Sequence, residues 1–128
     1  MNLVDSSGWI EFFQADLNGP VFKPIVEDRQ HLLVPSIALF GVHKVLSRSL
    51  PEDLVARCLD VMRRGRVLDL TASRAIAASQ VATRHRLALA DAAMYSMARE
   101  FGATFWTQDI DYQRLEGVRY CAKPGKSL

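Results

Sequence analysis

The chain has 128 residues, of which 16 are basic, 14 are acidic and 49% are hydrophobic. This length and composition suit one globular domain with a core of ordinary size. A formal net charge of +2 excludes a broad basic surface for nucleic acid or membrane, so any contact with RNA has to be local. Because no apolar run approaches the roughly 18 residues of a membrane span, we expect a cytoplasmic protein with no membrane contact and with both cysteines, Cys58 and Cys121, reduced.

The first half of the chain alternates between predicted strands and helices. Asn2 to Asp5 reads as a strand that ends in an acid, and Ser6 or Ser7 can cap a short helix from Trp9 to Phe13. The following predicted elements are a helix over 21–29, a buried strand over 32–34 closed by Pro35, a helix over 37–46 and a helix over 52–64.

The second half continues the same alternation. Its predicted elements are a strand over 67–70, helices over 71–84 and 87–101, a buried strand over 103–106, one helical turn over 111–115 and an edge strand over 118–120. Strands separated by helices imply right-handed crossovers, so we predict an α/β fold with a central parallel sheet and helices on both faces. The domain is predicted to span 1–122, followed by a loose tail over 123–128.

Acidic side chains stand where the predicted strands end. Asp5 follows the first strand, Asp109 follows the fourth, and Asp91 lies in the first turns of a helix. The carboxyl ends of parallel strands meet at one edge of a sheet, so these acids are expected to converge. Carboxylate oxygens are ligands that Mg²⁺ and Mn²⁺ prefer, and clustered carboxylates are costly unless a cation neutralises them. The sequence therefore predicts a metal site there, with Asp111 as a fourth candidate.

Each acid also has a purely structural interpretation. Asp5 can cap the helix that follows it, and Asp91 suits the positive end of a helix dipole. Asp109 and Asp111 can be turn residues, because aspartate bonds its own backbone two residues further on. The joint placement of the acids at one edge favours the metal site over these alternatives.

Several segments together resemble a known family. They are Leu3-Val4-Asp5-Ser6-Ser7, Val34-Pro35-Ser36, Leu89-Ala90-Asp91-Ala92-Ala93, and Thr107-Gln108-Asp109-Ile110-Asp111 followed by Leu115-Glu116-Gly117-Val118. Their order and spacing resemble the PIN domain over nearly the whole chain, most closely the VapC-type toxins of bacterial type II toxin–antitoxin systems. The resemblance implies a metal-dependent endoribonuclease that cuts RNA, with Asp5, Asp91 and Asp109 as catalytic ligands of Mg²⁺ or Mn²⁺.

The resemblance also implies partners. They are an RNA substrate, a cognate antitoxin that holds the toxin inactive, a second copy in a homodimer, and a toxin–antitoxin hetero-oligomer that contacts DNA only through the antitoxin. Ser6 and Thr107 resemble the small polar residues of the family's site, where they could bond a carboxylate. A serine cap and a threonine at a strand end account for them equally well.

The chain departs from the family pattern at Gly41, which stands six residues after Pro35, where the family has a glutamate. Glycine costs about 1 kcal/mol relative to alanine inside a helix, and Gly41 shares the inward face with Ile37 and Val45. Neither helix propensity nor packing explains it, so we expect this vacant acid position to mark a disabled or weakened site. The alternative is a natural variant in which another acid, such as Glu11, substitutes or three acids suffice.

Two other classes of function compete with the nuclease. A phosphate-handling protein of the receiver or phosphatase type also has aspartates at strand ends, but it needs a lysine in the same crevice, and the only late lysines lie from Lys123 onward in the tail. A non-catalytic PIN-like module that binds antitoxin or RNA is the second alternative, and Gly41 keeps it open.

Overall fold

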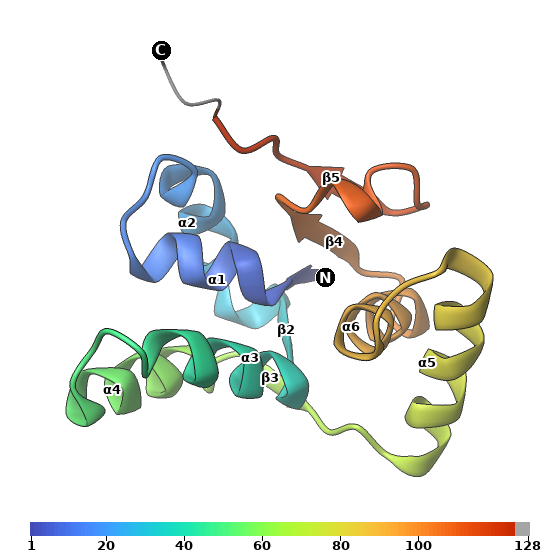
Figure 1. Cartoon of the computed structure of the whole chain (residues 1–128), viewed down its shortest axis with the longest axis horizontal. Helices are drawn as coiled ribbons and strands as arrows, with labels where there is room; N and C mark the ends of the chain where they lie inside the picture. The colour runs from blue at the N-terminus through green and yellow to red at the C-terminus, as the bar shows by residue number, and fades with distance from the viewer. Residues whose placement is uncertain (125–128) are drawn as a thin grey trace.

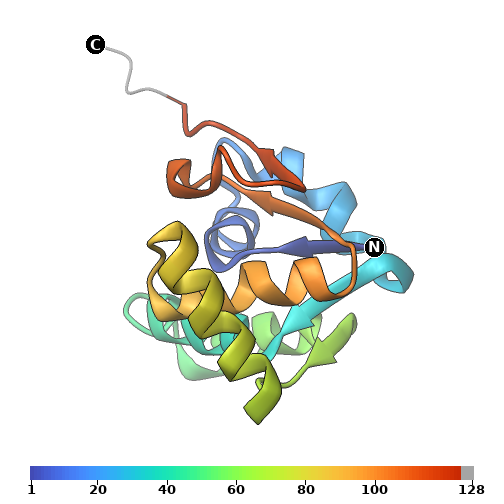
Figure 2. The ribbon, with the colours of Figure 1, turned by 90° about the vertical axis from the view of Figure 1, so that its right-hand side faces the viewer.

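A five-stranded parallel sheet with the strand order β3-β2-β1-β4-β5 forms the centre of the computed structural model, which describes residues 1–124 (Figure 1). Six helices flank this sheet, with α1 on one side of it and α6 on the other, and α5 lies beside α6 (Figures 1 and 2). The predicted α/β fold with a central parallel sheet is therefore confirmed. Among the described residues, every helix is too short or too polar to span a bilayer.

The elements follow one another in a regular order. They are β1 Asn2–Val4, α1 Ser6–Phe13, α2 Gly19–Glu27, the 3-10 helix η1 Arg29–His31, β2 Leu32–Pro35, α3 Ser36–Leu46, α4 Glu52–Met62, β3 Arg66–Leu68, α5 Ala72–His85, α6 Leu89–Glu100, β4 Thr104–Thr107, the 3-10 helix η2 Ile110–Tyr112 and β5 Val118–Tyr120.

The three middle strands carry the core of the sheet. All four residues of β2 are buried, as are Leu3 and Val4 of β1, because a parallel strand covered by helices on both faces has no solvent side. The outer strands β3 and β5 are more exposed. Trp9 and Met97 are fully buried in helices on the two sides, and Trp106 is partly buried against the core, as expected for core residues.

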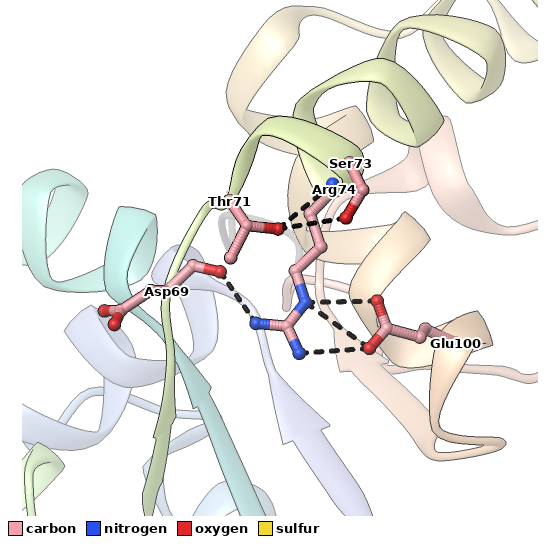
Figure 3. Close-up of polar contacts among 5 residues, drawn as sticks. All are labelled: Asp69, Thr71, Ser73, Arg74 and Glu100. Atoms are coloured by element: carbon pink, nitrogen blue, oxygen red, sulfur yellow. Dashed lines mark hydrogen bonds and ion pairs between the residues drawn. The ribbon is translucent and has the colours of Figure 1, made fainter.

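A charged cluster that we call the α5 foot joins the beginning of α5 to the end of α6 (Figure 3). The Nε and Nη2 atoms of Arg74 donate to the carboxylate of Glu100, each at 3.1 Å, and its Nη1 donates to the carbonyl oxygen of Asp69 at 2.8 Å. Thr71 caps α5 by accepting from the backbone N–H of Arg74 at 3.3 Å. Because α6 carries Asp91 at its opposite end, this cluster fixes the helix that presents an acid.

Some predicted boundaries were wrong by a few residues. The strand predicted over 67–70 is Arg66–Leu68, and the helix predicted over 21–29 begins at Gly19 with Pro20 in its first turn, where a missing N–H costs nothing. The helix predicted over 87–101 begins at Leu89, because the chain first passes through Arg86 with a positive φ of 55°. Of the tail predicted over 123–128, residues 125–128 lie outside the described residues.

Candidate active site

Asp5 and Thr107 lie side by side at the carboxyl edge of the sheet. β1 and β4 are hydrogen-bonded neighbours, with Val4 opposite Trp106, so the residue after β1 meets the end of β4. The hydroxyl of Thr107 donates to Oδ2 of Asp5 at 2.6 Å and accepts from the backbone N–H of Asp109 at 2.9 Å. One buried hydroxyl thus links the two strand-end acids.

The second oxygen of Asp5 forms the cap of α1. Its Oδ1 accepts from the Ser7 hydroxyl at 2.8 Å and from the backbone N–H of Gly8 at 2.9 Å. The expectation that Ser6 or Ser7 caps this helix was wrong, because Asp5 does so and α1 begins at Ser6. Of the two serines, Ser7 bonds the carboxylate, whereas the Ser6 hydroxyl donates to the sulfur of Met94 at 3.7 Å.

The carboxyl group of Asp5 is held in an unfavourable place for a negative charge. It is 3% exposed, and burial raises its pKa from 3.8 to about 6, although the hydrogen bonds from Thr107, Gly8 and Ser7 oppose the rise. The charge of Asp109 raises the pKa further. Within residues 1–124, no cationic side chain contributes to this shift, so the charge of Asp5 is uncompensated by that part of the chain.

Asp91 lies within the electrostatic influence of Asp109. Asp91 lies half-buried in the first turn of α6, where burial raises its pKa, the nearby hydroxyl of Tyr112 lowers it, and the charges of Asp109 and Asp111 raise it. Asp109 accepts from the backbone N–H of Asp111 at 2.9 Å, which is the turn considered in the sequence. Asp111 itself is exposed. The structural and electrostatic roles of these acids therefore coexist.

Tyr112 is a feature of this region that sequence reasoning missed. Its side chain is fully buried, and its hydroxyl lies beside the carboxylate of Asp91 without completing a hydrogen bond within the described residues. The only signal in the sequence was its spacing, since a 3-10 turn that begins after Asp109 brings the third residue back toward the acids.

Gly41 faces the beginning of α1. A Cβ atom added there would lie 2.7 Å from Oγ and 3.2 Å from Cβ of Ser6, the residue that follows Asp5. The inference that packing does not explain this glycine was therefore wrong, because α3 and α1 approach closely at this point. A longer side chain at position 41 requires the Ser6 hydroxyl to rotate. That side chain would begin beside Ser6, the residue next to Asp5.

Glu11 is held in a different network. Its Oε1 accepts from the backbone N–H of Asn18 at 3.1 Å, and its Oε2 accepts from Nε2 of Gln108 at 3.1 Å. Asn18 in turn donates to Oε1 of Gln108 at 3.0 Å and to the carbonyl oxygen of Ala122 at 3.1 Å. Glu11 thus links α1 to the chain at Asn18 and Gln108.

A surface pocket opens beside Asp109. Ser7, Gln108, Ile110, Tyr120 and Lys123 complete its lining. Lys123, which the sequence argument placed in the tail, thus lines the same pocket as a strand-end acid. An ammonium group there is suited to a phosphate oxygen.

The donor chemistry of Asp5, Asp91 and Asp109, which we call the acid group, fits a hard divalent cation. The three offer only carboxylate oxygens, and the charge of Asp109 raises the pKa of both Asp5 and Asp91. As placed, however, no three His, Cys, Asp or Glu side chains among residues 1–124 lie close enough to hold a metal ion between them. The residue types fit a cation, and their spacing leaves the coordination incomplete.

Comparison with known families decides the identity of the fold. The family model described as "PIN domain" matches residues 3–118. The chain belongs to the PIN domain family. The PIN-domain resemblance seen in the sequence is thereby confirmed, and the match contains every member of the acid group as well as Gly41. Among curated proteins, none matches this sequence.

Several solved structures share the fold of this chain. A toxin–antitoxin complex from Klebsiella pneumoniae has a TM-score of 0.78 at 16% identity and covers 93% of this chain and 96% of its own. VapC20 of Mycobacterium tuberculosis, described as a toxin that cleaves the sarcin-ricin loop, has a TM-score of 0.75 at 18% identity, with 91% and 95% covered. The DNA-bound VapBC of Salmonella typhimurium has a TM-score of 0.72 at 18% identity, with 95% and 98% covered.

Proposed function

We propose that this chain is the toxin of a type II toxin–antitoxin system and acts in the cytoplasm as a metal-dependent endoribonuclease. The observation that carries the proposal is the acid group at the carboxyl edge of a PIN-domain sheet, where burial and the charge of Asp109 raise the pKa of both Asp5 and Asp91. The similarity to a toxin that cleaves the sarcin-ricin loop supports RNA as the substrate class.

Asp5, Asp91 and Asp109 would hold Mg²⁺ or Mn²⁺. A divalent cation there would supply activated water and stabilise negative charge on a phosphoryl group. Thr107 links the two strand-end acids, because its hydroxyl donates to the Asp5 carboxylate and accepts from the backbone N–H of Asp109. Lys123, in the pocket beside Asp109, is suited to hold a phosphate of the RNA backbone.

We further propose that Gly41 impairs this copy. A glutamate at position 41 would bring a fourth carboxylate toward Ser6 and the end of β1, and its absence leaves fewer oxygens to close the coordination. A PIN-like module that binds without cutting is the second candidate function, and Gly41 is the observation that favours it.

The similar structures support an antitoxin as a partner. Two of them are described as a toxin–antitoxin complex and a DNA-bound VapBC. We propose that this chain likewise binds a cognate antitoxin. We further propose that it forms a homodimer within a larger toxin–antitoxin assembly and meets DNA only through the antitoxin.

A cleavage assay on a mixed pool of small RNAs tests the proposal. The chain and its Gly41→Glu variant are each incubated with Mn²⁺, with Mg²⁺ and with chelator. We expect Gly41→Glu to cut at least about tenfold faster than the parent with Mn²⁺. Loss of a residue that only orients a metal ligand typically lowers activity by about tenfold or more, and a ligand itself should contribute at least as much. Chelator is expected to stop both proteins.

Gly41→Gln is the matched control, because glutamine makes the same demand on Ser6 without adding a carboxylate. It is expected to stay at the parent rate. Equal rates for Gly41→Glu and the parent would reject the impaired site, and cutting that persists in chelator would reject the metal mechanism. If none of the three folded proteins cut RNA under any condition, the binding module would be favoured.

A further inference from the structure

The hydroxyl of Tyr112 is buried without a partner, which is unusual for a phenol. The residue is fully buried, and its oxygen makes no hydrogen bond within the described part of the chain. Burying a hydroxyl in this way costs roughly 1–3 kcal/mol, so each such group needs an explanation. The aromatic ring alone would fill the space without that cost.

The ring of Tyr112 is fixed from two sides. Its centroid lies 4.7 Å from that of Phe105 on β4 and 6.4 Å from that of Tyr95 on α6. Its backbone N–H donates to the carbonyl oxygen of Asp109 at 3.3 Å. The hydroxyl therefore has little freedom to swing toward another partner, and its direction is set by the same turn that carries Asp109.

The acid group acts on this hydroxyl. Burial raises the pKa of Tyr112 most, and the charges of Asp91, Asp5 and Asp109 raise it further, in that order. Asp91 is the carboxylate with the largest effect on Tyr112, and the Tyr112 hydroxyl in turn lowers the pKa of Asp91. The two groups are therefore neighbours, although their contact falls short of hydrogen-bond geometry.

We propose that Tyr112 is a positioning residue of the acid group, whose hydroxyl donates to the Asp91 carboxylate when that carboxylate turns to bind a divalent cation. This inference rests on the proposed function of the site. One oxygen of Asp91 would then accept from Tyr112, which would leave the other oxygen free to hold the cation. Tyr112 acts through Asp91 and touches neither RNA nor cation.

Tyrosine NMR tests the proposal, because the chain contains only three tyrosines, Tyr95, Tyr112 and Tyr120. With ¹³C at the ζ carbon of tyrosine, each hydroxyl reports one signal, assigned by the Tyr→Phe variants. Mg²⁺ is titrated into the full chain and into Gly41→Glu. The Tyr112 signal is expected to move on binding, while the Tyr95 signal, whose hydroxyl already donates to the carbonyl oxygen of Glu116 at 2.7 Å, stays in place.

Calorimetry supplies a second readout that does not depend on activity. Tyr112→Phe removes the donor and keeps the ring, so it is expected to weaken Mg²⁺ binding by roughly tenfold, since a hydrogen bond to a charged group is lost. Tyr95→Phe is the matched control and is expected to bind Mg²⁺ as the parent does.

The outcomes separate this inference from the function on which it rests. If calorimetry detects Mg²⁺ binding while the Tyr112 signal stays in place and Tyr112→Phe binds equally well, the role of Tyr112 is rejected and the metal site stands. If Mg²⁺ binds neither the chain nor Gly41→Glu, the metal site is rejected, and this inference with it.

Discussion

The α5 foot and the acid group are built from charge in opposite ways. In the α5 foot, Arg74 meets the carboxylate of Glu100 and the carbonyl oxygen of Asp69, so opposite charges are paired at the protein surface. In the acid group, like charges meet in a buried place, and burial raises the pKa of Asp5 and of Asp91. The first arrangement holds two helices together, whereas the second opposes folding.

The difference separates charges that stabilise the fold by themselves from charges that do not. A partly exposed ion pair contributes modestly to stability and needs nothing from outside the chain. Buried like charges are unfavourable until a ligand neutralises them, and perturbed pKa values of this kind cluster at functional sites. In this chain Asp5 belongs to both classes, since it caps α1 and also carries an uncompensated charge.

The largest predicted effect is a pH-dependent stability that originates at Asp5. Its folded pKa, about 6, is above the unfolded value, so the folded state binds the proton more tightly. Protonated Asp5 contributes its full share of the free energy of unfolding below about pH 4. That contribution, roughly 3 kcal/mol, is lost as the pH rises through 6. Urea unfolding in chelator is therefore expected to show Asp5→Asn equal to the parent near pH 4 and more stable than it at pH 7.

Asp60→Asn is the control for this titration, because Asp60 is exposed on α4. Its stability is expected to follow the parent within about 0.5 kcal/mol at each pH. The claim that Asp5 carries an uncompensated charge would be contradicted if the difference in unfolding free energy between the parent and Asp5→Asn did not change between pH 4 and 7.

A smaller effect is expected at the α5 foot. Arg74→Ala removes the pair with Glu100, the bond to Asp69 and the cation–π contact with Phe101, 5.6 Å from the guanidinium carbon to the ring centre. Because the Arg74 and Glu100 side chains remain 20% and 44% exposed, we expect a loss of only about 1 kcal/mol in unfolding free energy, with metal response unchanged.

Arg84→Ala tests the same helix at its other end. Arg84 is exposed in the last turn of α5, so its removal is expected to cost less than about 0.5 kcal/mol. Equal losses for Arg74→Ala and Arg84→Ala would show that the paired cluster adds no stability.

Much of the fold was predictable because the signals are local. The apolar run from Leu32 to Val34 and the acid that follows Val4 mark strands and a strand end without any knowledge of distant residues. The turn at Asp109 followed from the tendency of aspartate to bond its own backbone, and the structure has that bond. The order of parallel strands then brought Asp5 and Thr107 together.

The details of the site were not predictable because they depend on contacts between distant elements. Ser6 and Ser7 are equivalent by local rules, and only the approach of α3 and α6 turns Ser6 away from Asp5 toward Gly41 and Met94. Tyr112 is an ordinary aromatic residue in the sequence. Its hydroxyl becomes notable only because α6 brings Asp91 beside it.

The most direct test of the central claim is the effect of Mn²⁺ on the unfolding free energy of the intact chain at pH 8. If the acid group binds the cation, stability rises with its concentration, by about 1.4 kcal/mol at ten times the Kd. Asp109→Asn is expected to lose this rise, while Arg74→Ala keeps it. A gain no larger than that of an NaCl control of equal ionic strength, or an equal gain in Asp109→Asn, would contradict the assignment of the acid group as a cation site.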